Sequence, residues 1–211
     1  FEKYKNKYRD IHRADRILKA EGDSPDKYKI SKQADALMSF YNLNDREIQE
    51  VFEATNIELP DDFKEKNFKY YYERTSHGST LSKLVHANLA NIWNIDNLAW
   101  PLYWEALQSD YSDTQGGTTA EGIHAGLMAG TIYQCITGFA GVDFRDYSIN
   151  ITPKLPKHWI SVACKFTFRN TKFELKVYKD SINIKTDKTI GIKINSMPTV
   201  IEKDDWWNIE L

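Results

Sequence analysis

The sequence predicts a mostly α-helical first part followed by an all-β second part. Up to about residue 139, apolar side chains recur every three or four positions, which is the spacing of amphipathic helices. After Gly141 apolar and polar side chains alternate, which is the spacing of half-buried strands. At 211 residues the chain is long enough for one or two domains with a buried core. We therefore expect two domains, over residues 1–144 and 145–211.

The helical part is expected to begin after an irregular, polar connection over residues 1–28, because breakers cluster from Gly22 to Pro25. An apolar stripe then starts at Ile30, just before Lys32 and Gln33. Further helices are expected after the capping-box pattern of Asn44 to Glu47, after Pro60, after Ser79, over about 95–111 and over about 120–139. The last of these is rich in glycine and alanine, which favours close packing.

The β part is predicted from period-2 segments joined by short polar turns. These segments cover about 147–151, 162–168, 173–178, 182–185 and 190–194. Because the turns are short, we expect an antiparallel sheet built from hairpins.

Composition excludes several classes of protein. With 28 basic and 30 acidic residues, the formal net charge is -2, and no basic stripe favours nucleic acid as a partner. No signal peptide or membrane-spanning segment is visible, so no membrane partner is expected. Cys135 and Cys164 lie far apart in apolar surroundings and are interpreted as buried thiols of a cytoplasmic protein, with no metal site.

The first candidate site is the run Ser76-His77-Gly78-Ser79-Thr80 at the start of a predicted helix. Helix N-termini carry free N–H groups and the positive end of the helix dipole, and anions bind there. A glycine lets an anion approach the backbone closely. Ordinary helix capping by Ser79 is the alternative, since serine and threonine are common capping residues. Nucleophilic catalysis by Ser76 or Ser79 with His77 is not favoured, because no nucleophile motif surrounds them.

A second candidate site lies around Thr118 and Thr119, a polar turn that leads into the glycine-rich helix. Glu121 and His124 follow at i,i+3 spacing, so we expect them to share a helix face, either orienting a substrate or making a simple buried contact. The spacing does not complete a metal site.

Two further groups have both a functional and a structural interpretation. Lys32 and Gln33 are interpreted either as a cation and an amide in a polar cleft or as solvated surface residues. His86 is expected to be a core histidine.

Together these motifs resemble glycoside hydrolase family 65, which contains maltose, trehalose, kojibiose and nigerose phosphorylases and some acid trehalases. The resemblance covers roughly residues 28–177 and corresponds to the family's C-terminal portion. It rests on Lys32-Gln33-Ala34-Asp35, on Arg74 to Ser79, on Thr118 to His124 with Met128 to Thr131, and on Asn150 to Trp159.

The resemblance implies part of an (α/α)6 barrel followed by a small antiparallel β-sandwich. It implies inverting cleavage of an α-linked glucosyl disaccharide by inorganic phosphate, giving β-glucose 1-phosphate, with no cofactor. By this resemblance Ser76, His77, Gly78, Ser79, Thr118 and Thr119 bind phosphate, and Lys32, Gln33, Glu121 and His124 contact the substrate. Family phosphorylases are often dimers, so a homodimer of the full-length protein is expected.

One departure limits this interpretation. The family's general acid is a glutamate in an Asp-Glu-Tyr-His-like motif, and this sequence contains no such motif. We therefore expect the acid to lie upstream, in a longer enzyme of which this chain is the C-terminal piece, and expect the isolated chain to be inactive. A family hydrolase with Glu121 as the base and a non-catalytic carbohydrate-binding fragment are the alternatives.

Overall fold

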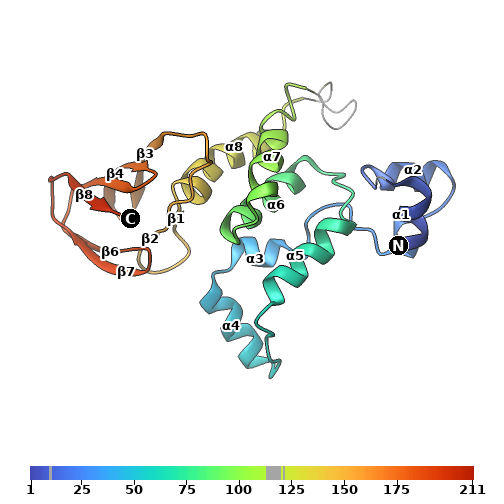
Figure 1. Cartoon of the computed structure of the whole chain (residues 1–211), viewed down its shortest axis with the longest axis horizontal. Helices are drawn as coiled ribbons and strands as arrows, with labels where there is room; N and C mark the ends of the chain where they lie inside the picture. The colour runs from blue at the N-terminus through green and yellow to red at the C-terminus, as the bar shows by residue number, and fades with distance from the viewer. Residues whose placement is uncertain (10, 113–119, 121) are drawn as a thin grey trace. The chain divides into compact units, whose positions relative to one another are not determined.

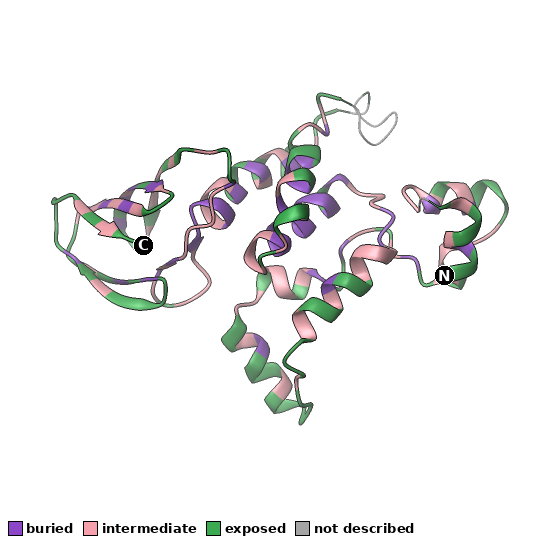
Figure 2. Ribbon diagram, in the orientation of Figure 1, coloured by how far each residue is buried: buried purple, intermediate pink, exposed green. Residues whose placement is uncertain are grey.

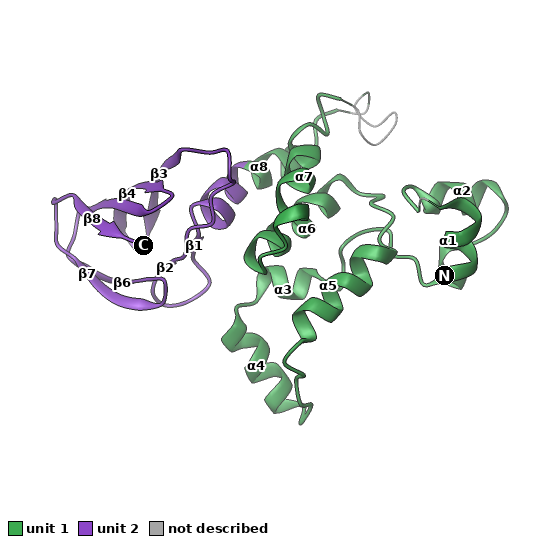
Figure 3. Cartoon of the chain, viewed as in Figure 1, with its two compact units in different colours: residues 1–131 green, residues 132–211 purple. Residues whose placement is uncertain are grey.

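The structure is a computed structural model that describes residues 1–9, 11–112, 120 and 122–211 (Figure 1). It divides into two compact units, Phe1–Thr131 and Ile132–Leu211 (Figure 3). The first is helical and the second consists mainly of two β-sheets. We describe each unit by itself.

The N-terminal segment is folded, so the expectation of an irregular connection over residues 1–28 was wrong. It forms α1 (Glu2–Tyr8), α2 (Ala14–Ala20) and the short 3-10 helix η1 (Pro25–Tyr28). A small core forms from Tyr4, Ala14, Leu18 and Ile30. Helices α1 and α2 are each only seven residues long and carry few apolar side chains, so the periodicity over a longer window does not reveal them.

The helix expected from Ile30 is mostly absent, because only α3 (Met38–Asn42) forms. Ser31 instead makes a parallel β-bridge with Thr75, and its N–H donates to the Arg74 carbonyl at 2.9 Å. This long-range pairing overrides the local helical period. Lys32 and Gln33 therefore lie in a bend beside the Ser76 turn and do not open a helix.

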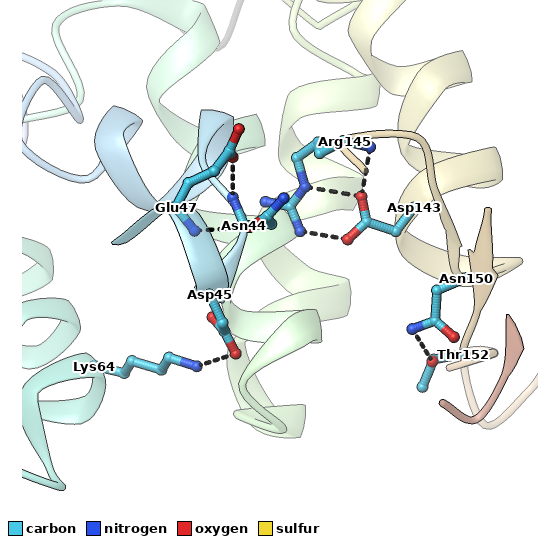
Figure 4. A network of polar contacts seen from close by, with 8 residues as sticks. All are labelled: Asn44, Asp45, Glu47, Lys64, Asp143, Arg145, Asn150 and Thr152. Carbon is cyan, nitrogen blue, oxygen red and sulfur yellow. Dashed lines mark hydrogen bonds and ion pairs between the residues drawn. The ribbon is translucent and has the colours of Figure 1, made fainter. Parts of the chain in front are cut away.

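The next two helices confirm the sequence prediction. They are α4 (Asp45–Ala54) and α5 (Phe63–Arg74). The capping box is complete: the Glu47 N–H donates to Asn44 Oδ1 at 2.9 Å, and the Asn44 N–H donates to a Glu47 carboxylate oxygen at 2.9 Å (Figure 4). Lys64 Nζ lies 2.7 Å from Asp45 Oδ2 and so joins the two helices at the surface.

The best-buried helix is α6 (Thr80–Ile92), which packs against α7 (Asp96–Leu107). Every residue from Ser82 to Ala90 is buried (Figure 2). The core beneath it contains apolar side chains from the segment just before α3 and from the helices α5, α6 and α7. These residues are Ala34, Leu37, Phe68, Val85, Leu89, Ala90 and Ala99.

The glycine-rich helix starts later than expected, with α8 spanning Ala125–Gln134. A π-helical turn follows over Cys135–Phe139. Gly130 sits against α6, since a Cβ there would lie 2.3 Å from Leu84 Cδ2. The small residues thus permit the close approach that composition indicated.

The second unit contains two four-stranded sheets, of order β1-β2-β6-β7 and β3-β4-β5-β8. The strands of the first sheet are β1 (Val142–Asp143), β2 (Asn150–Ile151), β6 (Ile190–Ile194) and β7 (Met197–Ile201). Those of the second are β3 (Ser161–Phe168), β4 (Thr171–Tyr178), β5 (Ser181–Thr186) and β8 (Trp207–Glu210). One apolar core draws on both sheets, including Ile151, Phe173 and Ile192.

Hairpins dominate, as the alternation predicted, but β2 pairs with β6 in parallel. This is a correction to the purely antiparallel expectation, because the parallel pair joins segments far apart in the sequence. Cys135 and Cys164 are not joined in a disulfide and are only partly buried, which corrects the expectation of buried thiols. Asp143 and Arg145 form an ion pair at 2.8 Å beside β1 (Figure 4).

Within the described residues, no helix is both long and apolar enough to cross a membrane. A closed (α/α)6 barrel is likewise not seen in the part of the chain that the structure describes.

Candidate functional site: the turn before helix α6

The turn Ser76–Thr80 joins α5 to α6 and is pinned to the segment that contains Lys32. The Ser76 N–H donates to the Ser31 carbonyl at 2.8 Å, and the Gly78 N–H donates to the Lys32 carbonyl at 2.7 Å. The structure therefore brings together two of the motifs that the sequence analysis singled out. It also shows that these two N–H groups are already engaged, so any anion at the turn must be held by other donors.

Gly78 is required by its neighbours rather than by its own backbone conformation. A Cβ at this position would lie 2.9 Å from Lys32 Cγ and 3.3 Å from Asp15 Oδ2. Asp15 belongs to α2 and forms an ion pair with Arg13, whose Nε lies 3.4 Å from Asp15 Oδ1. The Arg13 N–H donates to the Ser76 carbonyl at 3.0 Å. The N-terminal segment thus closes one side of the turn.

His77 is held in an unusual backbone conformation. Its φ of 47° lies in the left-handed region, which costs an L-residue roughly 1–2 kcal/mol. Its ring Nδ1 lies 3.1 Å from Ser82 Oγ in the first turn of α6. Strained residues of this kind persist where the surroundings fix them, and they cluster at functional sites.

His86 lies directly behind His77 and is fully buried, as expected for a core histidine. Its Nδ1 lies 2.8 Å from the Ser82 carbonyl, and its ring centroid lies 5.1 Å from that of His77. A carbonyl can only accept, so Nδ1 of His86 carries the hydrogen. In the neutral imidazole Nε2 is then a bare acceptor.

Both histidines are neutral near pH 7. Burial, reinforced by the neighbouring His86, Lys83 and His12, lowers the pKa of His77 to about 3. Burial lowers the pKa of His86 to about 4. The Lys83 side chain is 8% exposed, and its Nζ lies 2.6 Å from a Glu105 carboxylate oxygen, so its positive charge is balanced.

The turn has hydrogen-bonding capacity that the described residues do not use. Ser76 is 0% exposed, and its Oγ has no hydrogen-bond partner among the residues that the structure describes; the same holds for His86 Nε2. Buried polar atoms are usually bonded, so such atoms mark a place for water or a ligand. Ser79 occupies the N-cap position of α6 but makes no capping hydrogen bond, which contradicts the capping alternative.

The second candidate site is only partly described, because Thr118, Thr119 and Glu121 lie outside the described residues. His124 precedes α8, so the expectation that it shares a helix face with Glu121 was wrong. Instead the His124 N–H donates to Asp110 Oδ2 at 2.8 Å, and its Nδ1 contacts Asp110 Oδ1.

Two other observations limit the chemistry of these sites. The side chain of Gln33 donates to Asp35 Oδ1 at 2.7 Å. In the part of the chain that is described, no group of three His, Cys, Asp or Glu side chains could hold a metal ion.

Comparison with known proteins identifies the family. The profile of the glycosyl hydrolase family 65 central catalytic domain matches residues 1–133, and that of the family 65 C-terminal domain matches residues 142–196. The chain belongs to glycoside hydrolase family 65. The resemblance noted from the motifs is thereby confirmed.

Family 65 relatives of this chain include several phosphorylases. Trehalose 6-phosphate phosphorylase of Lactococcus lactis subsp. lactis (strain IL1403) is 40% identical over 203 residues, covering 88% of this chain and 26% of the relative. Maltose phosphorylase of Bacillus subtilis (strain 168) is 32% identical over 146 residues, covering 69% of this chain and 18% of the relative. The chain therefore spans about a quarter or less of the length of these relatives.

A solved structure supports the fold of this family 65 chain. A putative kojibiose phosphorylase from the human microbiome superposes with a TM-score of 0.70 at 26% identity, over 87% of this chain and 25% of that one. The match covers most of both units described above.

Sequence reasoning missed four residues that the structure places at the two sites: Arg13, Asp15, Ser82 and Asp110. Ser82 could have been found, because its spacing from His86 is i,i+4 on one helix. The others approach their partners through long-range packing that carries no local signal. His86 was recognised as buried, but its contact with His77 was not predicted.

Proposed function

We propose that this chain is part of a glycoside phosphorylase. The enzyme would cleave an α-linked glucosyl disaccharide with inorganic phosphate, inverting the anomeric centre to give β-glucose 1-phosphate. The observation that carries the proposal is the turn before α6. It combines the dipole of a 13-residue helix with the Ser76 hydroxyl, which has no hydrogen-bond partner among the described residues, and with the Ser79 hydroxyl, which makes no capping bond; both hydroxyls are donors suited to an anion. The names of the family 65 relatives support the same reaction class.

We assign phosphate binding to Ser76, His77, Gly78 and Ser79, with Thr118 and Thr119. The N–H of Gly78 is already bonded to the Lys32 carbonyl, so it would not donate to the phosphate. The role of Gly78 would instead be to leave room beside the turn for the side chains of Lys32 and Asp15. Lys32, Gln33, Glu121 and His124 would contact the sugar.

No general acid is assigned within these 211 residues, so the acid that protonates the leaving oxygen would come from elsewhere in a longer protein. In that protein, residues 1–144 would contribute to an (α/α)6 barrel and residues 145–211 would form the β-sandwich domain. The two cysteines are not joined in a disulfide, which favours a cytoplasmic enzyme.

The disaccharide is best sought among both free and phosphorylated sugars. The relative with 40% identity is named for trehalose 6-phosphate, whereas others are named for maltose, kojibiose and trehalose. Trehalose 6-phosphate therefore belongs in the substrate panel beside the unphosphorylated disaccharides.

The decisive experiment assays the complete product of the reading frame that encodes this chain against this panel, with and without inorganic phosphate. Release of β-glucose 1-phosphate only when phosphate is present is the expected result. Equal release of free glucose without phosphate would refute the proposal and indicate a hydrolase with Glu121 as the base. The 211-residue chain alone is expected to show no turnover.

Replacing Gly78 with alanine is expected to raise the dissociation constant for phosphate about tenfold, because the new Cβ displaces Lys32 and the Asp15 carboxylate. Isothermal titration with inorganic phosphate measures this. Gly126→Ala is the matched control, since a Cβ there meets nothing within 4 Å. Equal phosphate affinity in both variants would show that the packing around Gly78 does not shape the anion site.

A further inference from the structure

Asp110 holds His124 at two points. Asp110 lies in the turn that follows α7, and His124 directly precedes α8. The His124 N–H donates to Asp110 Oδ2 at 2.8 Å, and His124 Nδ1 contacts Asp110 Oδ1. The Met128 N–H in turn donates to the His124 carbonyl at 3.0 Å, which ties His124 to the first turn of α8. One carboxylate therefore fixes both the backbone and the ring of the same histidine.

The contact with Asp110 also decides which ring nitrogen carries the hydrogen. An ionised carboxylate can only accept hydrogen bonds, so Nδ1 of His124 is the donor. In the neutral imidazole Nε2 is then an acceptor. The Asp110 side chain is 10% exposed, whereas that of His124 is 29% exposed. Water thus has little access to the carboxylate, while the His124 side chain remains accessible.

The ring contact exceeds what the backbone requires. The His124 N–H is satisfied by Asp110 Oδ2 alone, and that bond already holds the chain before α8. The second oxygen additionally fixes the rotation and the tautomer of the ring. A hydrogen bond of this kind at one nitrogen is the usual way in which a protein sets the chemistry of the other nitrogen.

We propose that Asp110 is a positioning residue of the sugar site, which holds His124 in the Nδ1–H tautomer so that Nε2 accepts a hydrogen bond from a hydroxyl of the bound disaccharide. This inference rests on the proposed function, in which His124 contacts the sugar. Asp110 itself would not touch the substrate. A sugar hydroxyl is a donor, which a bare Nε2 requires, whereas a fully ionised phosphate offers only acceptors. The assignment therefore places His124 on the sugar and not on the phosphate.

The first test replaces Asp110 with asparagine in the complete protein. An amide has one acceptor and one donor group, so it cannot accept from both the His124 N–H and Nδ1. If its oxygen keeps the backbone N–H, its NH₂ group faces Nδ1, and the hydrogen of the ring moves to Nε2. Nε2 then no longer accepts from the sugar. We expect kcat/KM for phosphorolysis of the disaccharide to fall at least about tenfold.

A second variant separates the ligand contact from the structural contact. His124→Asn keeps an amide donor at the position of Nδ1 for Asp110 but has no atom at the position of Nε2. Its melting temperature is expected to stay close to that of the wild type, while kcat/KM falls about tenfold to a hundredfold. In the His124→Asn background, Asp110→Asn should lower kcat/KM by no more than about twofold, because a positioning residue acts only through the group that it positions.

Asp23→Asn is the matched control in the same helical unit. Asp23 also accepts one backbone and one side-chain hydrogen bond, from the Ser24 N–H at 2.9 Å and from the Tyr28 hydroxyl at 2.6 Å. The same carboxylate-to-amide change is therefore made at a comparable pair of bonds. Its kcat/KM is expected to stay within about twofold of the wild-type value.

Several outcomes overturn the inference. Wild-type kcat/KM in Asp110→Asn, or independent losses from Asp110→Asn and His124→Asn that multiply in the double variant, contradicts it while leaving the phosphorylase intact. A wild type that phosphorolyses none of the disaccharides refutes the proposed function and this role with it. If Asp110→Asn does not fold, ¹⁵N imidazole spectra of the wild type decide. A ring with its hydrogen on Nδ1, whose Nε2 signal shifts when the disaccharide binds, supports the inference. A hydrogen on Nε2, or an Nε2 signal that the disaccharide does not shift, refutes it.

Discussion

Replacing Gly141 with alanine is expected to destabilise the β-sheet unit by about 2–4 kcal/mol. Gly141 has a φ of 72°, and a Cβ there would lie 1.9 Å from the Thr152 carbonyl oxygen. The Thr152 N–H in turn donates to the Gly141 carbonyl at 2.8 Å, so the two segments cannot separate without losing a hydrogen bond. Left-handed strain and overpacking against backbone therefore act together.

Hydrogen exchange of the amides in β3, β4 and β5 measures this effect in the second unit alone. Gly191→Ala is the matched control, because it lies in β6 and a Cβ there meets nothing within 4 Å. Its effect is expected to stay within about 0.5 kcal/mol. Equal protection in the two variants would mean that Thr152 can move away at little cost.

The second large effect is a loss of stability in acid. His77 and His86 are neutral in the folded chain, with pKa values of about 3 and 4, whereas an unfolded histidine titrates near pH 6.5. Below about pH 6.5 the unfolded state therefore binds more protons than the folded state, and folding stability falls as the pH falls. The loss continues until the pH passes the folded pKa values. At pH 5 it amounts to about 2 kcal/mol for each histidine, or about 4 kcal/mol together.

Urea unfolding at about pH 7 and pH 5, without sulfate or phosphate, measures this loss. Other groups also titrate in this range, so the informative quantity is the difference between the wild type and His86→Asn. This variant keeps a donor at the position of Nδ1 for the Ser82 carbonyl but cannot be protonated, and it should lose about 2 kcal/mol less than the wild type. An identical acid loss in both proteins would show that His86 is not held neutral by the fold.

Local sequence patterns predicted the helices from residue 44 onward, the capping box at Asn44 and Glu47, the hairpin strands β3 to β5 and the family. These features depend on local spacing, which side-chain periodicity and turn residues record directly. Family membership followed because the motifs around Lys32, His77 and His124 are themselves short stretches of sequence.

How these motifs meet depends on long-range packing. The bridge between Ser31 and Thr75 replaced the expected helix start, because backbone pairing between distant segments overrode the local pattern. The parallel pairing of β2 with β6 and the approach of Arg13 and Asp15 to the turn arose in the same way. The pKa of His77 depends on burial and on the neighbouring His86, and the pKa of His86 depends on burial and on the Ser82 carbonyl, which no spacing in the sequence encodes. Residue types specify which chemistry is available at a site, and long-range packing decides which charge states it can hold.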